Sequence, residues 1–423
     1  SVYRNVEGTI TDIMKVLYFV QYFIPEKCSS PYLVTDLIEA MAQQGWKVDV
    51  YTSTPTRGVD RDTIRYYRRH RVETMFSDNV HIHRMPLFQE KTKVIQRTLR
   101  FLLFSLECLW IGLTKDADVV FCGSGPPTQG VILGLIHKLT HKKVVYNLQD
   151  AFPESLVTTG ITSEGSAVYN VGLKMERFTY NNVDRIITIS ESMFGNMISK
   201  VDNPDKVSMV YNWLDDTVHH VERQDNDLFE RFDLSRDRFI VTYAGNVGKA
   251  QGIETLIEAA DILKSDSDIE FCIFGAGASL EDIKAYAAGK GLDNVRFLPL
   301  LGKDDISKVY SLGDVSLVMC RKGVGTSGMP SKTWSIIAAQ TALIVSFDAG
   351  SELYNMVSSG NCGIAVDAER PAELADAILK MKSDKAVKES CIANAYRVML
   401  DKASRKSSVG KYIDQIKSCI KDN

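Results

Sequence analysis

The sequence predicts an α/β protein of two Rossmann-like domains, each a doubly wound parallel sheet, facing across a cleft. Short apolar runs of strand length alternate with helical patterns along most of the chain. A chain of 423 residues is also too long for one ordinary hydrophobic core. The alternation is interrupted at residues 215–238 by a polar, acidic stretch, which we expect to link the two domains.

The first series of strands begins near the N-terminus. Residues 15–20 are an apolar run, residues 33–44 have helical spacing that Gly45 ends, and residues 47–52 are the next apolar run. A strand, a helix and a strand in this order predict a βαβ unit with parallel strands. The same pattern predicts further strands at residues 80–84, 119–122, 144–147, 185–190 and 207–212.

A second series follows the acidic stretch. It predicts strands at residues 240–244, 269–274, 295–298, 315–319, 342–346 and 363–366. Residues 389–420 have a helical pattern long enough for two helices. We therefore expect a first domain of residues 14–214 joined by a C-terminal helix at about residues 395–423, and a second domain of residues 215–394.

Composition and charge exclude several classes of protein. The chain is 45% hydrophobic and 24% charged, as in globular proteins, and its net charge of −3 argues against a general nucleic-acid binder. Its eight cysteines form no CxxC pair, which is typical of reduced thiols in a cytoplasmic protein. No stretch has the form of a signal peptide or reaches the ~20 apolar residues of a transmembrane helix.

Two loops are the most informative stretches. The strand predicted at residues 240–244 ends in GNVGKAQG, a glycine-rich turn with one cation at residues 245–252. Residues 328–334, GMPSKTW, place a proline, a serine and a lysine at a helix start. Both loops can present backbone N–H groups beside a lysine, which suits a phosphate. Either loop alone is also ordinary punctuation in an α/β protein, but two such loops favour a ligand that bears a diphosphate.

With these loops on tandem Rossmann-like domains, the chain resembles the GT-B retaining glycosyltransferases of family 4. Within that family it is most similar to the bacterial capsule, exopolysaccharide and O-antigen branch of the fucosaminyltransferase-like type. The resemblance runs from residue 15 to about residue 380. Besides the GNxGxxQG turn and the PSK helix start, the matching pieces are residues 21–26, 150–155, 190–191, 211–213 and 346–353.

The resemblance implies a metal-independent hexosyltransferase that needs no cofactor. It would move a sugar, with retention, from a nucleotide-diphosphate sugar to a polyprenyl-diphosphate-linked oligosaccharide at the inner face of the cytoplasmic membrane. Two alternatives stay open. A non-catalytic polysaccharide-assembly protein could retain only the fold, and a nucleotide-sugar 2-epimerase uses the same architecture but needs acids and histidines in the cleft.

The resemblance also implies the donor site. Lys249 and Lys332 are expected at the departing diphosphate, where fixed cations stabilise the charge that develops. The other expected donor-binding residues are Gly245, Asn246, Gly248, Gln251, Gly252, Pro330 and Ser331.

The sequence departs from the family pattern at four positions in and around these two loops. Asn246 and Gln251 stand where many members have an arginine and a lysine, and Ser327 and Ser335 replace paired glutamates. Glu352, after a predicted strand, is our candidate substitute for the lost ribose contact.

On the acceptor side, the resemblance singles out Asp150, Glu154 and Glu26. Asp150 follows a predicted strand and would orient the acceptor or stabilise positive charge on the sugar ring; the alternative is an N-cap. Glu154 is either a second acceptor contact or a capping residue.

No metal site is expected. The DxD triplets at residues 60–62, 225–227 and 266–268 lie in polar connectors, and His81 with His83 lacks a third ligand.

A further pattern suggests a membrane surface. Residues 57–71 hold six arginines, and residues 91–100 add two lysines and two arginines directly before the apolar segment at residues 101–111. Cations beside an apolar segment too short to span suit an anionic bilayer surface. The alternative is that this segment is a buried helix of the domain.

Overall fold

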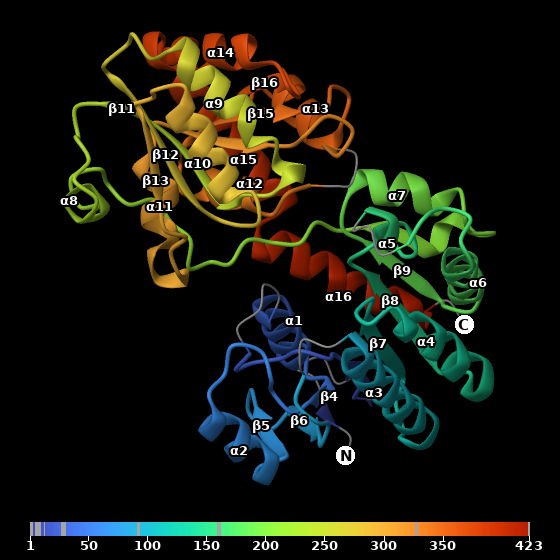
Figure 1. Cartoon of the computed structure of the whole chain (residues 1–423). Helices are drawn as coiled ribbons and strands as arrows, with labels where there is room; N and C mark the ends of the chain where they lie inside the picture. Colours follow the sequence, from blue (N-terminus) through green and yellow to red (C-terminus); the bar gives the residue numbers. More distant parts are fainter. Residues whose placement is uncertain are drawn as a thin grey trace. The chain divides into compact units, whose positions relative to one another are not determined.

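The computed structural model describes residues 3–4, 10–11, 13–26, 31–90, 94–158, 162–325 and 329–421. The chain divides into two compact units (Figure 1). The first consists of residues 1–211 and 408–423, and the second of residues 212–407. The acidic stretch at residues 215–238 thus belongs to the second unit. The division also leaves residues 395–407 in the second unit, whereas the sequence analysis assigned them to the first.

The first unit is an α/β structure around one large sheet. Its strands are β3 (Lys15–Phe19), β4 (Lys47–Ser53), β5 (Val72–Met75), β6 (Val80–Met85), β7 (Val119–Gly123), β8 (Lys143–Leu148), β9 (Arg185–Thr188) and β10 (Val207–Met209). They lie in the order β10-β9-β8-β7-β3-β4-β6-β5, and every pair except β5 with β6 is parallel. A separate two-stranded sheet pairs β1 (Tyr3–Arg4) with β2 (Ile10–Thr11).

Helices connect these strands. They are α1 (Pro31–Gln43), α2 (Arg61–Arg69), α3 (Val94–Thr114), α4 (Thr128–Thr140), α5 (Glu154–Thr158), α6 (Ala167–Asn181), α7 (Glu191–Ile198) and η1 (Pro204–Lys206). The chain returns to this unit through α16 (Arg405–Lys421), where the buried Tyr412 donates a hydrogen bond to Asn147 Oδ1 at 3.0 Å. The predicted strands are confirmed, whereas β5 and α2 were not predicted.

The second unit is a smaller, wholly parallel α/β structure. Its strands are β11 (Phe239–Asn246), β12 (Ile269–Ala276), β13 (Val295–Leu298), β14 (Val315–Met319), β15 (Ala342–Phe347) and β16 (Ile364–Asp367), in the order β13-β12-β11-β14-β15-β16. Its helices are α8 (Leu228–Arg231), η2 (Lys249–Gln251), α9 (Ile253–Ile262), α10 (Leu280–Gly289), η3 (Lys303–Asp305), α11 (Ile306–Leu312), α12 (Lys332–Ala338), α13 (Glu352–Ser359), α14 (Pro371–Ser383) and α15 (Lys385–Lys402).

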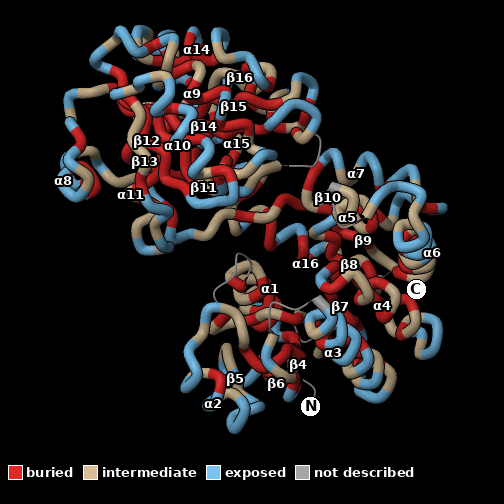
Figure 2. The backbone as a smooth tube through the Cα atoms, viewed as in Figure 1, coloured by how far each residue is buried: buried red, intermediate tan, exposed pale blue. Residues whose placement is uncertain are grey.

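Each unit has its own core, formed by the strands and the helix faces against them (Figure 2). The central strands are mainly apolar because helices cover both faces of the sheet. Every residue of β14 and β15 is buried, for example. Parallel strands all end at the same edge, so the loops after β11 and β15 lie at one edge of the second sheet.

The cysteines agree with the sequence analysis where they can be compared. Seven cysteines of the described residues are free and buried; Cys28 lies outside those residues. Across the parts of the chain that the structure describes, no helix combines the length and the apolar character needed to cross a membrane.

Candidate active site

The predicted donor site begins where β11 ends. Gly245 has a φ of 138°, a conformation that favours glycine. A Cβ added at Gly245 would lie 2.9 Å from Nζ of Lys332. The glycine therefore makes room for a lysine from the start of α12, more than eighty residues later in the chain. Gly245 and Lys332, both of which the sequence analysis assigned to the donor site, lie against each other.

Tyr243 holds this lysine, and the sequence analysis missed it. The Lys332 ammonium group donates to the Tyr243 hydroxyl oxygen at 3.3 Å and lies 4.3 Å from the centre of the tyrosine ring. The same hydroxyl donates to the carbonyl oxygen of Asn246 at 2.6 Å. Tyr243 is fully buried. It lies two residues before Gly245 on the same strand, so the alternation of a β-strand puts both on one face.

Lys332 has no anionic partner among the residues that the structure describes. Burial lowers the pKa of Lys332 to about 8. Among the described residues it forms no ion pair, and its polar partner there is a tyrosine hydroxyl. A desolvated ammonium group of this kind gains most from an anionic ligand, because the ligand supplies the missing countercharge.

The glycine-rich turn is held by an amide pair. The Asn246 side-chain amide donates to Gln251 Oε1 at 3.0 Å, and the backbone N–H of Gly248 donates to the same oxygen at 3.1 Å. Asn246 and Gln251, which stand where the family that the sequence resembles often has cations, thus hold the turn in place by hydrogen bonds to each other and to Gly248. Gly252, with a φ of 60°, lies so close to the backbone of Arg321 that a Cβ would approach its nitrogen to 3.2 Å.

Lys249, the other lysine predicted at the diphosphate, differs from Lys332 in its exposure to solvent. It is exposed on η2 and, within the described residues, its side chain forms no hydrogen bond or ion pair. It can therefore swing toward a bound anion, but the structure does not hold it there in advance.

The start of α12 contributes less than the sequence suggested. Ser331 occupies the N-cap position, but its side chain makes no capping hydrogen bond. The backbone N–H groups of Thr333 and Trp334 already donate to Pro330 and Ser331, at 3.0 and 3.2 Å. A phosphate at this end would be bound by the Lys332 side chain more than by these two amides. Ser335 lies on α12, whereas Ser327 lies outside the described residues.

Glu352 lies at the same edge of the second sheet. It is the first residue of α13, which follows β15 and is capped by Ser351 through the backbone N–H of Tyr354 at 3.4 Å. Glu352 is half-buried.

On the first unit, Asp150 follows β8. The backbone N–H groups of Gln149 and Asp150 donate to Ser124 Oγ at 3.0 and 3.2 Å, which fixes the turn. Desolvation of the Asp150 carboxyl raises its pKa, although the residue as a whole is exposed. Within the described ranges its carboxylate accepts no capping hydrogen bond, so the N-cap alternative is not realised.

The other two acceptor-side acids have structural partners. Glu154 is bound by Lys200 at 2.6 Å, and Lys200 also donates to Glu176 at 2.7 Å. Glu26 is buried, and its carboxylate accepts from the backbone N–H groups of Thr56 and Arg57 at 2.8 and 3.0 Å. Burial raises the pKa of Glu26. Both acids brace the first unit, whatever else they contact.

The acidic triplets and the histidines also have local partners. Asp60 caps α2 through Thr63 at 2.7 Å, and Asp266 pairs with Lys382 at 2.7 Å. His83 Nε2 lies 2.8 Å from Asp49 Oδ1. Within the described residues, no group of three or more His, Cys, Asp or Glu side chains has the arrangement of a metal site.

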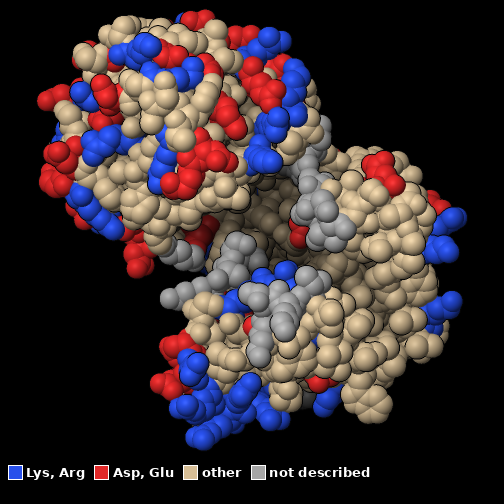
Figure 3. Space-filling model, viewed as in Figure 1, with Lys and Arg blue, Asp and Glu red and all other residues tan. Residues whose placement is uncertain are grey.

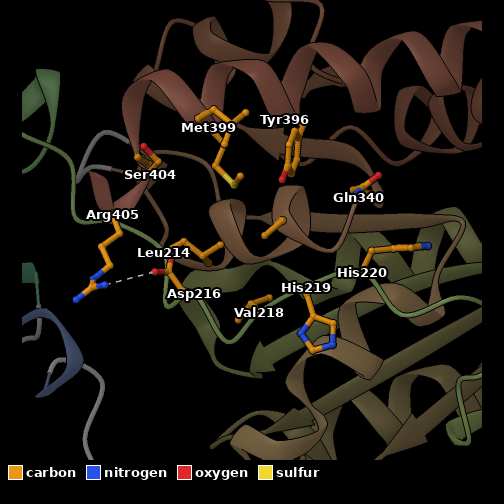
Figure 4. A pocket seen from close by; sticks show the side chains of 13 residues that line it. Leu214, Asp216, Val218, His219, His220, Gln340, Tyr396, Met399, Ser404 and Arg405 are labelled. Atoms are coloured by element: carbon orange, nitrogen blue, oxygen red, sulfur yellow. Dashed lines mark ion pairs between the residues drawn. The ribbon is translucent and has the colours of Figure 1, made fainter. Parts of the chain in front are cut away.

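A cavity of about 300 Å³ lies elsewhere in the second unit (Figure 4). It is lined by residues that follow Leu214, by the end of α12 and by the end of α15. His220 Nδ1 lies 2.7 Å from the carbonyl oxygen of Ala339, and Arg405 pairs with Asp216 at 4.0 Å. None of the predicted site residues lines this cavity.

Comparison with known proteins matches both units to glycosyltransferase families. The family model Glycosyl transferases group 1 matches residues 224–398, and the model Glycosyltransferase Family 4 matches residues 32–218. The chain is 27% identical over 375 residues to the putative colanic acid biosynthesis glycosyl transferase WcaI of Escherichia coli (strain K12), which covers 84% of this chain and 88% of that protein.

Two solved structures share the fold over nearly the whole chain. Sucrose-phosphate synthase from Thermosynechococcus elongatus superposes with a TM-score of 0.72 at 15% identity, covering 97% of this chain and 100% of that one. Anabaena HepE in complex with UDP gives a TM-score of 0.71 at 13% identity, covering 96% and 100%. At these identities the likeness shows the fold, which is GT-B.

Proposed function

We propose that this chain is a bacterial hexosyltransferase. It moves a sugar from a nucleotide-diphosphate donor to a growing surface polysaccharide. The proposal is supported by the match to a Glycosyl transferases group 1 domain and a Glycosyltransferase Family 4 domain on a GT-B fold. The observation that carries the proposal is the Lys332 ammonium group, held at the Gly245 turn by Tyr243 and without an ion pair in the described residues. The donor diphosphate supplies the countercharge.

The chemistry follows from where the charge develops. The bond between the anomeric carbon of the sugar and the phosphate oxygen breaks, and negative charge collects on the departing diphosphate. Lys332 stabilises that charge from a desolvated position, where a fixed cation acts more strongly than in water. Lys249 adds a second, mobile cation. The amide pair of Asn246 and Gln251 keeps the turn in shape for the phosphates.

We propose retention and independence of a metal, as the family resemblance implies. In a front-face reaction the acceptor hydroxyl bonds to the anomeric carbon on the side that the diphosphate leaves. Its proton passes to the leaving phosphate oxygen, so no strong protein base is required. Asp150 orients the acceptor or stabilises positive charge on the sugar ring, and Glu352 contacts the ribose. The two lysines neutralise the diphosphate, so no bound metal ion is needed.

For the acceptor we propose a polyprenyl-diphosphate-linked oligosaccharide at the inner face of the cytoplasmic membrane. The name of WcaI, which assigns that protein to colanic acid biosynthesis, supports surface polysaccharide as the product. The capsule, exopolysaccharide and O-antigen branch of the family fits the same product, and the fucosaminyltransferase-like type stays a prediction. The chain would act there as a peripheral protein.

A thermal-shift screen tests the donor site first. Unfolding would be followed with UDP, GDP, dTDP, ADP and CMP, each with and without EDTA. A ligand at 100 times its dissociation constant stabilises by about 2.7 kcal/mol. We expect one nucleoside diphosphate to shift the melting temperature equally with and without EDTA, and the shift to disappear in Lys332→Ala. A shift that EDTA abolishes would overturn the metal-free mechanism.

A second measurement separates enzyme from assembly protein. The sugar donor of the nucleotide that binds would be incubated with membranes that contain lipid-linked acceptor, and nucleotide release would be measured. We expect release coupled to sugar transfer. Binding without release would favour the non-catalytic assembly protein, and release of a sugar epimerised at carbon 2 would favour the epimerase.

A further inference from the structure

Helix α3 of the first unit exposes a stripe of large apolar side chains. They are Ile95, Leu99, Leu102, Leu103, Leu106 and Trp110, which we call the α3 stripe. Ile95 is 82% exposed, Leu106 60% and Trp110 69%. Their spacing of three or four residues puts them along one face of the helix. This one helix carries six of the 18 large apolar side chains that are exposed among the described residues, so the stripe is not a random scatter.

The opposite face of α3 anchors the helix firmly. Phe104 and Cys108 are fully buried in the core of the first unit. Arg100 is also fully buried and donates to Ser53 Oγ at 2.6 Å and to the carbonyl oxygen of Thr54 at 3.0 Å. The sequence analysis counted Arg100 among the cations of a membrane surface, which is wrong. The helix is neither wholly buried nor loosely attached, because one face is in the core and the other is bare.

The first unit also exposes several cations. Arg97 lies on α3 between Ile95 and Leu99 and is half-exposed, with Glu90 3.5 Å away. Helix α2 and the residue pair after it carry five exposed arginines, namely Arg61, Arg65, Arg68, Arg69 and Arg71. They form the blue cluster over α2 in Figure 3. Arg57, which also belonged to the predicted basic patch, is instead held by Glu90 at 2.8 Å. Lys91 and Lys93 lie outside the described residues.

We propose that the α3 stripe enters the surface of an anionic bilayer, with the arginines of α2 on the lipid headgroups. The proposal rests on the proposed function for its purpose, because a lipid-linked acceptor must be reached at the membrane. An apolar face that carries Arg97, on a unit with exposed arginines, matches the two chemistries of such a surface. Leucines with a tryptophan suit the headgroup boundary. A helix of 21 residues whose inner face is anchored in the core lies in the interface plane and does not span it.

A second copy of the chain is the less suitable occupant. In a two-fold dimer built on this stripe the same surface meets itself. Such a contact would cover Arg97 of both copies, and taking a charged group out of water costs free energy. A bilayer with acidic headgroups presents the opposite charge.

Vesicle flotation of the full chain tests this proposal. Vesicles of phosphatidylcholine alone would be compared with vesicles that also contain phosphatidylglycerol, at low salt. We expect flotation with the anionic vesicles, and at least a tenfold weaker association for the double variant Leu102→Glu/Leu106→Glu. Arg65→Glu/Arg68→Glu should lose only the part of the binding that added salt also removes. A matched control, Ile262→Glu/Leu379→Glu, changes two exposed apolar residues of the second unit and should float as the natural chain does.

The outcomes are separable. Failure of the natural chain to float with either vesicle would overturn the proposal, as would unchanged flotation of Leu102→Glu/Leu106→Glu. A dimer in solution that this variant splits, with no vesicle binding, would make the stripe an interface between copies. The vesicles hold no acceptor and no nucleotide, so the nucleotide-induced thermal shift reports on the proposed function independently. That shift should be unchanged in every variant, which also shows that each one folds.

Discussion

The two sheets treat their predicted polar residues in opposite ways. In the second unit, Lys332 reaches the turn after β11 and stays without an ion pair among the described residues. In the first unit, Glu26 and Glu154 are used by the protein itself, one for the backbone of residues 56–57 and one for Lys200. At the edge of the second sheet, Lys332 has no countercharge among the described residues. The two acids of the first unit instead bind groups of that unit itself.

The difference teaches which sequence signals report a site. A glycine-rich turn at the end of a strand indicates that the backbone leaves space for another group, as Gly245 does for Lys332. An acidic residue after a strand carries no such constraint, because a carboxylate can equally cap a loop or bind a nearby lysine. Lys332 is therefore the stronger candidate, and Asp150 is the only predicted acid of the first unit whose carboxylate has no such partner in the described residues.

Lys332→Ala tests the comparison with the largest expected effect. Without the desolvated ammonium group, kcat/KM for sugar transfer should fall by roughly 10²–10³, or about 2.7–4 kcal/mol of transition-state stabilisation. Steady-state kinetics with the donor found in the nucleotide screen would measure it. The melting temperature of the free protein should not fall, because the variant removes a cation whose pKa burial already lowers. Full activity would remove Lys332 from the site.

Glu26→Ala tests the structural side of the comparison. The part-buried backbone N–H groups of Thr56 and Arg57 and the buried one of Phe23 would lose their acceptor, and the free energy of unfolding should fall by about 2–3 kcal/mol. Glu26→Gln keeps one acceptor oxygen and should lose less. Denaturant unfolding would measure both, and nucleotide binding should be unchanged. A loss of transfer with full stability would instead make Glu26 an acceptor contact.

The pH dependence of donor binding follows from Lys332. Its pKa in the free protein lies at about 8, so the side chain is charged below that pH and neutral above it. The affinity for the matching nucleoside diphosphate should therefore fall by about tenfold from pH 7 to pH 9. The ligand does not confuse this range, because a terminal phosphate loses its second proton near pH ~6. Calorimetry should also show proton uptake on binding near pH 8, and a flat profile would contradict the assignment.

Tyr243→Phe asks whether the tyrosine positions the lysine. The variant keeps the ring under the ammonium group but removes the hydroxyl that accepts from Lys332 and donates to Asn246. We expect a three- to tenfold weaker nucleotide affinity, about 1 kcal/mol. The inflection of the pH profile should also move lower, because the ammonium group loses an acceptor. A change in melting temperature with an unmoved inflection would leave Tyr243 with a packing role alone.

Much of the fold could be predicted because short stretches of the sequence determine where each strand lies. Apolar runs located the parallel strands, and a wholly buried strand such as β15 gives the clearest run. Strand β5 was missed because it is a half-exposed antiparallel edge strand with the sequence VETM, which has no buried run to find. Helix α3 shows the opposite failure. Both of its faces are apolar, so spacing alone could not say that Arg100 is buried and Trp110 is exposed.

The site could be predicted only where its residues belong to a recognisable local pattern, such as a turn, a helix start or the alternation of a strand. The glycine turn and the PSK start could be read from the sequence, and Tyr243 could have been found from its alternation with Gly245. The partners of Glu26 and Glu154 could not, because Thr56 and Lys200 lie 30 and 46 residues away with nothing in the local sequence to pair them. Long-range pairing is set by the packing of whole elements.

Lys249→Ala is expected to have the smallest effect of these changes, and it tests the comparison at its finest point. Lys249 carries the same charge as Lys332 but is exposed. Solvent screens an exposed cation, and the side chain must be ordered when it binds, so transfer should fall only two- to fivefold, about 0.5–1 kcal/mol. Added salt should shrink this difference, whereas it should barely change the loss in Lys332→Ala. Kinetics of both variants across salt concentrations would show it, with Lys249→Arg as the charge-preserving control. An equal loss in the two variants would mean that the ligand draws the turn at residues 245–252 closed over the diphosphate. Lys249 would then become as desolvated as Lys332, and the contrast between the two lysines would belong to the free protein alone.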